Sequence, residues 1–185
     1  MKYIIEHMDN EMHKWSIIEY KHISSIVGKN NLIFTNVKKG ADKIKDLGKI
    51  REKSITEMNF EKICILDSDS KHVLKTSDKQ KFDYFVFGGI LGDNPPQKRT
   101  QNLIKSLKFP TRNLGDKQMS TDTAVLAVKM ILSGKKLSEI EFADTIIIPI
   151  REDEEVILPF RYILQDGKLM LAPGIVKMLK EQKGF

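Results

Sequence analysis

The residues best placed to do chemistry are glycines that directly follow an apolar run. Residues 82–87 are aromatic and β-branched, which is typical of a strand, and they lead straight into Gly88 and Gly89. In an open α/β sheet, ligands bind beyond the carboxyl ends of the strands. A glycine at that point lets a ligand approach the backbone amides and carbonyls, because no Cβ is in the way. Residues 87–96 are therefore a candidate ligand-binding loop, with an ordinary Gly-Gly turn as the alternative.

A second polar segment, residues 111–123, contains Gly115 and leads into hydroxyl and carboxylate side chains that can cap a helix. It is either another part of the same site or a long connection that ends in a helix cap. The first segment matches neither the phosphate-binding pattern that ends in Gly-Lys-Ser/Thr nor the spaced glycines of a dinucleotide-binding fold. The two segments therefore indicate a ligand site without identifying its ligand.

These segments need a scaffold, and the pattern along the chain predicts one. Strands are expected at residues 2–8, 32–37, 63–66, 82–87, 145–150, 156–164 and 168–171, and helices at 11–25, after Pro96, at 124–132 and at 175–182. Ser54 and Glu57 have the spacing of a capping box, which predicts a helix start. Residues 137–143 and 152–155 are expected to be connections. Alternating strands and helices predict an α/β sheet covered on both faces, and no shift in composition divides residues 1–185 into two domains.

The composition excludes several classes of protein. One cysteine, Cys64, excludes an internal disulfide framework, and four scattered histidines give no zinc-ligand spacing, so no metal is expected. The longest apolar runs are far below the roughly 20 residues that a membrane-spanning helix needs. A net charge of +6, from 31 Lys and Arg against 25 Asp and Glu, is mildly basic. We therefore expect a cytoplasmic globular protein with no membrane partner.

Two motifs in this order resemble one branch of the SPOUT superfamily of S-adenosylmethionine-dependent methyltransferases. The first runs Phe87-Gly-Gly-Ile-Leu-Gly-Asp93, with Pro95-Pro96 and Arg99-Thr100 after it, and the second runs Arg112-Asn-Leu-Gly115, with Gln118-Met119 and residues 121–125 after it. The opening of the chain, residues 3–7 with Trp15 and residues 19–23, is similar to that branch as well. The resemblance extends to about residue 130, and the remainder is similar only in its pattern of strands and helix. That branch includes a fungal protein-arginine methyltransferase that acts on a small-subunit ribosomal protein, and archaeal members described as RNA methyltransferases.

The resemblance implies a doubly wound, mostly parallel sheet whose C-terminal half is threaded as a deep trefoil knot, a rare exception to unknotted chains. It implies that the loops of the knot hold S-adenosylmethionine, the methyl donor, which leaves as S-adenosylhomocysteine. Carried over by motif, the donor-binding residues are Phe87, Gly88, Gly89, Gly92, Leu114, Gly115, Gln118, Met119 and Thr121. No metal is required, because the methyl of a sulfonium is already a good electrophile and the protein has only to align the acceptor with it.

Methylation of an arginine would also require a carboxylate. A guanidinium has a pKa of about 12.5–13.8 and no free lone pair while it is protonated, so a carboxylate should orient it and accept its proton. The candidates are Asp93, beside the glycine loop, and then Glu19 and Glu6. The alternatives are a helix cap for Asp93 and a solvated helix face for Glu19.

Substrate contacts are expected from one aromatic and two basic residues. Trp15 stands four residues before Glu19, so both share one helix face, and Trp15 is either a substrate platform or part of the core. Arg99 and Arg112 lie in residues 94–115, a stretch with five basic and no acidic side chains that can attract RNA phosphates. The alternative for this stretch is an ordinary solvated helix face.

The leading hypothesis is methyl transfer to a ribosome-associated target, with a protein arginine favoured because the matched branch has that activity. The alternatives are an RNA methyltransferase of the same fold, acting on rRNA or tRNA, and a non-catalytic RNA- or ribosome-binding module. The expected partner is accordingly a ribosomal protein or RNA, and the enzyme is expected to be a monomer or a homodimer. Every version that includes catalysis requires the two glycine segments to meet at one cleft.

Overall fold

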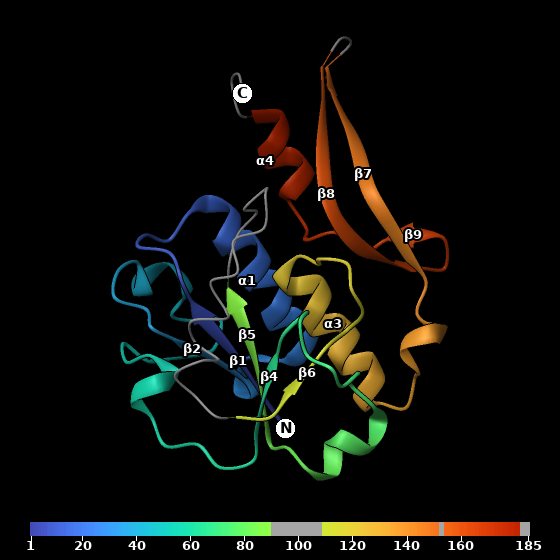
Figure 1. Cartoon of the computed structure of the whole chain (residues 1–185). Helices are drawn as coiled ribbons and strands as arrows, with labels where there is room; N and C mark the ends of the chain where they lie inside the picture. The colour runs from blue at the N-terminus through green and yellow to red at the C-terminus, as the bar shows by residue number, and fades with distance from the viewer. Residues whose placement is uncertain (90–108, 152–153, 182–185) are drawn as a thin grey trace.

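A six-stranded parallel sheet forms the body of the protein. The computed structural model describes residues 1–89, 109–151 and 154–181. The strands of the sheet are β1 (Lys2–His7), β2 (Leu32–Thr35), β3 (Lys49–Ile50), β4 (Ile63–Leu66), β5 (Tyr84–Gly89) and β6 (Thr111–Arg112). Their order is β3-β2-β1-β5-β4-β6, and every neighbouring pair is parallel (Figure 1). The prediction of an α/β fold with a mostly parallel sheet is confirmed.

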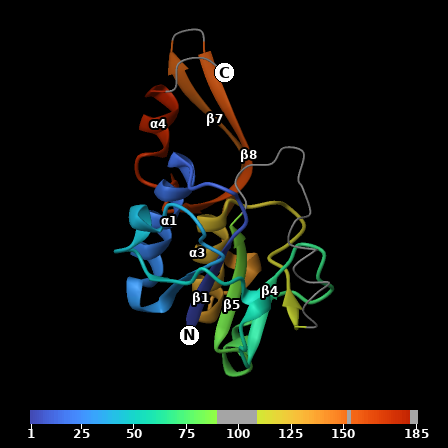
Figure 2. The same ribbon diagram turned by 90° about the vertical axis from the view of Figure 1, so that its left-hand side faces the viewer.

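Two α-helices, α1 (Lys14–Val27) and α3 (Thr121–Leu132), pack together on one side of this sheet (Figure 2). Side chains alternate along β1, so Tyr3 and Ile5 join the core beneath the helices while Ile4 joins the core of the opposite face. Burial of these apolar faces is the main force that holds helices and sheet together. Cys64 is fully buried in the helix-side core, as expected for a small apolar residue.

The opposite face of the sheet is covered by Ile55, Phe60 and Phe109 in the described part of the chain. The helix predicted after Pro96 lies outside the described residues, so helical cover on both faces stays a prediction. The capping box of Ser54 and Glu57 is present, but it starts a short 3-10 turn rather than an α-helix. The 3-10 turns of the described residues are η1 (Lys29–Asn31), η2 (Ala41–Ile44), η3 (Ile55–Glu57), η4 (Thr76–Gln80) and η5 (Leu137–Glu139).

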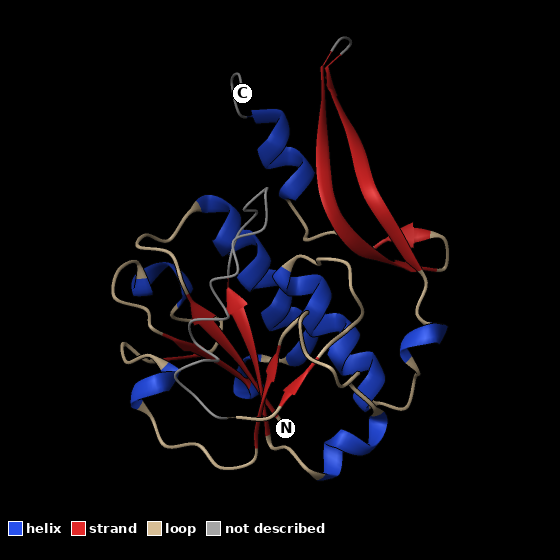
Figure 3. Cartoon of the chain, in the orientation of Figure 1, coloured by secondary structure: helices blue, strands red, loops and turns tan. Residues whose placement is uncertain are grey.

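The last quarter of the chain forms a separate antiparallel sheet that projects from the body (Figures 1 and 3). Its strands are β7 (Phe142–Arg151), β8 (Glu154–Gln165) and β9 (Lys168–Leu169), and the helix α4 (Ile175–Glu181) lies against it. The inner face of the hairpin, including Ile150 and Phe160, packs on Met178 and Leu179 of α4.

The strands of this hairpin are longer than the sequence pattern predicted. Phe142 and Ala143 begin β7, and Glu154 and Glu155 begin β8, although both pairs were expected to lie in connections. The prediction was wrong because the partner strand supplies the backbone hydrogen bonds, in the register Phe142–Ile163 and Pro149–Glu155, whatever the side chains at these positions.

The hairpin is also bonded to the body. The Arg161 amide of β8 donates to the Gln118 carbonyl at 2.9 Å, and Arg161 pairs with Met119 in a short bridge. This contact supports the single-domain prediction for residues 1–185, which stays a prediction. The predicted knot depends on the path of residues 90–108, outside the described residues, and stays a prediction as well. In the described residues, no helix combines the length and apolar character that a membrane crossing needs.

Candidate active site

Both glycine segments leave the same edge of the parallel sheet. β5 ends at Gly88 and Gly89, which pair with Glu6 and His7 at the end of β1. β6 ends at Arg112, and Leu114 and Gly115 follow it at the same edge, because the carboxyl ends of parallel strands coincide. One strand, β4, separates β5 from β6.

Phe87 and Leu114 both belong to the buried apolar core between the sheet and its helices. The two segments therefore leave one edge of the sheet, as a shared cleft requires, and the cleft itself stays a prediction.

The second glycine segment is held rigidly by its neighbours. The Asn113 amide donates to the His72 carbonyl at 2.8 Å, and the Asn113 carbonyl accepts from the Leu74 amide at 3.0 Å. The Asn113 side chain donates to the Ser70 carbonyl at 2.7 Å and accepts from the Gly115 amide at 3.0 Å. Gly115 has a φ of +98°, a conformation that glycine adopts without strain. The predicted donor residues Gln118 and Met119 are then fixed by β8 through Arg161.

Glu19, a predicted catalytic residue, lies buried where α1 meets the start of α3. Its carboxylate accepts a hydrogen bond from Trp15 Nε1 at 2.9 Å and hydrogen bonds from the amide and hydroxyl of Thr121. Burial raises the pKa of Glu19 well above its ordinary value, and the nearby Asp122 raises it further. The hydrogen bonds lower this pKa and offset only part of the rise. A buried carboxyl group with a high pKa, joined to the second glycine segment, suits proton transfer.

Four further polar residues surround Glu19, and the sequence did not single them out as site residues. Asp122 accepts hydrogen bonds from His22 Nδ1 at 2.7 Å, from the Ser120 hydroxyl at 2.6 Å and from the Thr123 amide at 2.9 Å. Tyr162 of β8 hydrogen-bonds to Ser120. We call Glu19, His22, Ser120, Asp122 and Tyr162 the α1–α3 polar cluster. Two of the four could have been predicted from the sequence: His22 is three residues after Glu19 on the same helix, and Asp122 lies inside the second motif.

Thr121 has a different neighbour from the one expected. It was predicted to hold the methyl donor, but its amide and hydroxyl are bonded to Glu19 in this structure. Trp15 is half-buried, donates to Glu19 and packs against the apolar core of the hairpin, so core packing and support of Glu19 account for its position.

Glu6, the other described carboxylate predicted to be catalytic, has a structural position. Its oxygens accept hydrogen bonds from the Ser54 hydroxyl at 2.5 Å, from the Ile55 amide at 3.1 Å and from the Thr35 hydroxyl. It is 2% exposed, and these donors from β2 and η3 occupy both oxygens. This geometry argues against a catalytic role, because a proton acceptor needs an oxygen that can face the substrate.

Arg112, predicted to contact the substrate, is also bonded to neighbouring residues of the protein. Its guanidinium makes a two-pronged ion pair with Asp78, at 3.0 and 2.9 Å, and lies over the ring of Phe82. Its side chain is 14% exposed, so it fastens β6 to η4 and is poorly placed for the predicted substrate contact. The remaining predicted site residues, Gly92, Asp93 and Arg99, lie outside the described residues.

The described residues fit the expected methyl donor and give no sign of a metal centre. Leu114 and Met119 can wall an adenine, and Gly88 and Gly89 have no Cβ that would keep a ligand from the backbone. Among the described residues, no group of three His, Cys, Asp or Glu side chains could hold a metal ion.

Known proteins match this chain over almost its whole length. A family model described as "Protein arginine N-methyltransferase SFM1-like" matches residues 2–184. Protein arginine N-methyltransferase SFM1 of Saccharomyces cerevisiae is 36% identical, over 98% of this chain and 95% of the relative. The crystal structure of that yeast enzyme with SAH has a TM-score of 0.90 at 35% identity, covering 97% of this chain and 94% of that one.

More distant structures share the fold alone. The crystal structure of a Trm10 protein from Thermococcus kodakaraensis has a TM-score of 0.58 at 16% identity, covering 75% of this chain and 96% of that one. The family match over residues 2–184 and the yeast relative decide the assignment. The chain belongs to the SFM1-like family of protein arginine N-methyltransferases.

Proposed function

We propose that this protein transfers the methyl group of S-adenosylmethionine to an arginine side chain of a ribosomal protein in the cytoplasm. The observation that carries the proposal is the link between Glu19 and Thr121, which joins a buried carboxyl group to the segment predicted to hold the donor. Structures of the yeast relative were solved with SAM and with SAH, which supports the same donor and product here.

The donor would be held by backbone and apolar side chains rather than by charges. We expect Gly88, Gly89 and Gly92 to bring the backbone close to it, and Leu114 and Met119 to contact its adenine. Gly115 and Gln118 belong to the same segment, which is held by backbone hydrogen bonds, and Phe87 is buried in the core at the end of β5. When bound, the donor supplies an electrophilic methyl group on sulfur, so the protein needs to provide alignment and a proton acceptor.

Glu19 is our choice for that acceptor. In the free protein its raised pKa favours the neutral form, and a positively charged guanidinium beside it favours ionisation. The ionised carboxylate would then orient the guanidinium and take the proton that the attacking nitrogen loses as the N–C bond forms, while the bond from the methyl carbon to sulfur breaks and S-adenosylhomocysteine leaves. Trp15 and Thr121 keep the carboxyl group in one position for this step. Asp93 is the second candidate, from the loop outside the described residues.

Methyl transfer can be tested with S-adenosylmethionine labelled in its methyl group and purified small ribosomal subunits. We expect label that is removed by protease and recovered as methylarginine after hydrolysis. Glu19→Gln should abolish the label, while Glu139→Gln, a change at an exposed side chain on η5, should leave it intact. Label that nuclease removes would contradict the arginine proposal and support RNA as the acceptor. Absence of SAH binding by calorimetry would support a non-catalytic module instead.

A further inference from the structure

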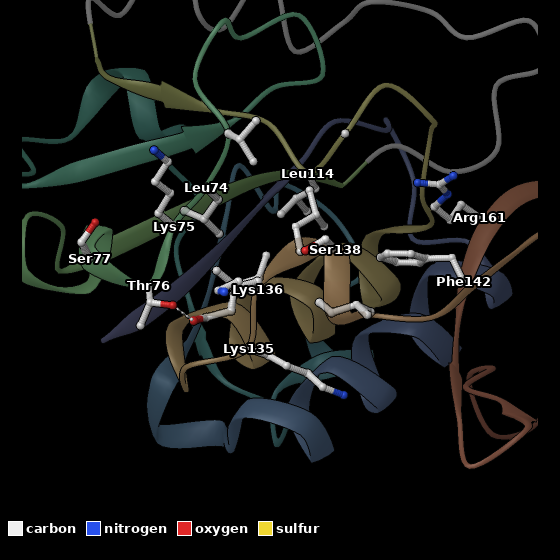
Figure 4. A pocket seen from close by; sticks show the side chains of 15 residues that line it. Leu74, Lys75, Thr76, Ser77, Leu114, Lys135, Lys136, Ser138, Phe142 and Arg161 are labelled. Atoms are coloured by element: carbon white, nitrogen blue, oxygen red, sulfur yellow. Dashed lines mark hydrogen bonds between the residues drawn. The ribbon is translucent and has the colours of Figure 1, made fainter.

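A cavity of about 810 Å³ lies between the segment after β4, the end of α3 and the start of β7 (Figure 4). Leu114 and Gly115 reach it from the second glycine segment. The other described donor residues, Phe87, Gly88, Gly89, Gln118, Met119 and Thr121, do not line it. Among the described donor residues, this cavity therefore shares only Leu114 and Gly115 with the predicted donor cleft.

The floor of this cavity is apolar. Leu74, Leu114, Ile131 and Ile140 are buried side chains of the core that face it. Phe142 closes one end, and the guanidinium of Arg161 lies over the Phe142 ring at 4.9 Å. A floor of this kind binds a flat apolar group more readily than a small hydrated ion.

The rim of the cavity is positively charged. Lys75 lies at one end and Arg161 at the other, with Lys135 and Lys136 between them (Figure 4). Among the described residues that line the cavity there is no Asp or Glu. Arg161 is paired with Asp144 at 2.7 Å. The lysines of the rim have weaker ion pairs or none among the described residues, so their positive charge remains available to a ligand.

Lys136 approaches Glu139 only at 4.0 Å, and the two side chains are 79% and 50% exposed, so that pair contributes little. Within residues 1–89, 109–151 and 154–181, no ion pair involves Lys75 or Lys135. The hydroxyls of Ser77 and Ser138 add polar groups to the rim.

We propose that this cavity binds a nucleotide unit of single-stranded RNA. The volume lies in the range of small-molecule sites, about 300–1,000 Å³, which is enough for a base and its sugar. Sites for single-stranded nucleic acid combine a cationic groove for the phosphates with an apolar platform for the bases, and both are present here. Lysines from two segments, before η4 and after α3, suit successive phosphates of a strand better than one isolated anion. The serine hydroxyls can bond the 2′-hydroxyl that distinguishes RNA.

The inference goes beyond the proposed methyl transfer, in which RNA is not the acceptor. None of the cavity lysines belongs to the predicted catalytic or donor-binding residues. A ribosome offers RNA beside its proteins, so this site would hold the enzyme near its substrate. RNA binding is measured without methyl transfer, and the two proposals can therefore fail independently.

The test is fluorescence anisotropy with a labelled oligouridylate octamer, with the matching DNA octamer and with uridine monophosphate as competitor. Lys75→Glu combined with Lys135→Glu should weaken RNA binding about tenfold or more and reduce its dependence on salt. Ser138→Trp, at an exposed position, fills the cavity without changing charge and should weaken binding as well. Lys177→Glu on α4, where the side chain is 82% exposed, is the matched control and should have little effect. Thermal unfolding and SAH binding should be unchanged in all variants.

Three results would overturn the proposal: no RNA binding at low salt, an equal loss in the Lys177→Glu control, or unchanged binding in Ser138→Trp. Equal binding of the DNA octamer would overturn the choice of RNA. Effective competition by uridine monophosphate would support the nucleotide site and identify free nucleotides as a source of the ligand.

Discussion

Glu6 and Glu19 are both buried carboxyl groups near the carboxyl edge of the parallel sheet, 2% and 4% exposed, and they differ in what surrounds them. Glu6 is enclosed by hydroxyl and amide donors from β2 and η3. Glu19 has hydrogen bonds from Trp15 and Thr121 but lies beside a second acid, Asp122. Burial with sufficient donors makes a carboxylate a structural brace, whereas burial beside another carboxylate favours proton exchange.

The largest expected effect is on catalysis. Glu19→Gln keeps the shape of the side chain but cannot accept a proton, so kcat should fall by about 10²–10⁴-fold. The affinity for SAH, measured by calorimetry, should change little, because Glu19 supports the donor segment only through Thr121. If Glu6→Gln lowers kcat as much while the protein stays folded, the division of roles between the two carboxyl groups is wrong.

Glu19→Gln should also change how the stability of the protein depends on pH. The folded state holds Glu19 with a raised pKa, so between the ordinary value of 4.5 and the raised value it binds more protons than the unfolded state, and stability falls as pH rises. Glu19→Gln removes this loss. The glutamine amide also leaves one donor of Trp15 or Thr121 without an acceptor at every pH, so the difference in Tm between the variant and the unmodified protein should move in favour of the variant from pH 4 to pH 8. A difference in Tm that stays constant over this range would contradict the prediction.

Asp122→Asn should shift the pH profile. Burial is the first cause of the raised pKa of Glu19 and the charge of Asp122 is the second, so removing that charge should lower the pKa. The acidic limb of kcat/KM, which requires ionised Glu19, should move to lower pH. The control is Asp166→Asn, an exposed position in the β8–β9 turn, where the profile should stay in place.

Glu6→Gln should destabilise the protein by about 1–3 kcal/mol, because one buried donor from β2 or η3 loses its partner. Urea unfolding with an unchanged m-value measures this loss. Rescue of stability by Glu6→Asp is not expected, since the shorter side chain cannot reach both donors. Stability equal to that of the unmodified protein would show that Glu6 is not a brace.

The smallest expected effect comes from alanine substitutions at two glycines, which distinguish the cost of backbone strain from a loss of donor binding. Gly115 and Gly134 both have positive φ values, +98° and +118°, so alanine at either should cost about 1–2 kcal/mol. A Cβ on Gly115 would lie 3.8 Å from Arg161 Nη1, which is ordinary contact, and one on Gly134 would meet nothing within 4 Å. Only Gly115→Ala should also weaken SAH binding. Equal SAH affinity in both variants would remove Gly115 from the donor site.

The two carboxylates also show what the sequence can and cannot predict. Local spacing correctly placed Trp15 and Glu19 on one helix face, where they share a hydrogen bond. The role of Glu6 depends on Ser54, 48 residues away, and that of Glu19 depends on α3, which brings Asp122 to His22 across 100 residues. Hydrophobic periodicity reports on neighbours along the chain, so it cannot predict contacts between residues this far apart in sequence. Arg112 fails for the same reason, because its partner Asp78 comes from another element.

The predicted donor-binding residues came from motif resemblance rather than from periodicity. Gly88 and Gly89 at the end of β5 and Gly115 after β6 indicated one edge of the sheet, and parallel topology brings both segments there. The sequence predicted strands in the hairpin but not their full length. Antiparallel pairing extends them through polar residues such as Glu155, which have no strand pattern. Its contact with Gln118 had no signal in the sequence, since a backbone hydrogen bond carries no side-chain preference.

That backbone contact couples the projecting hairpin mechanically to the chemistry. The loop that precedes α3 is clamped between residues 70–74 on one side and β8 on the other. A protein bound to the hairpin would therefore lie one backbone hydrogen bond away from Gln118 and Met119. The last quarter of the chain thus supports the predicted donor segment, even though no catalytic group has been assigned to it.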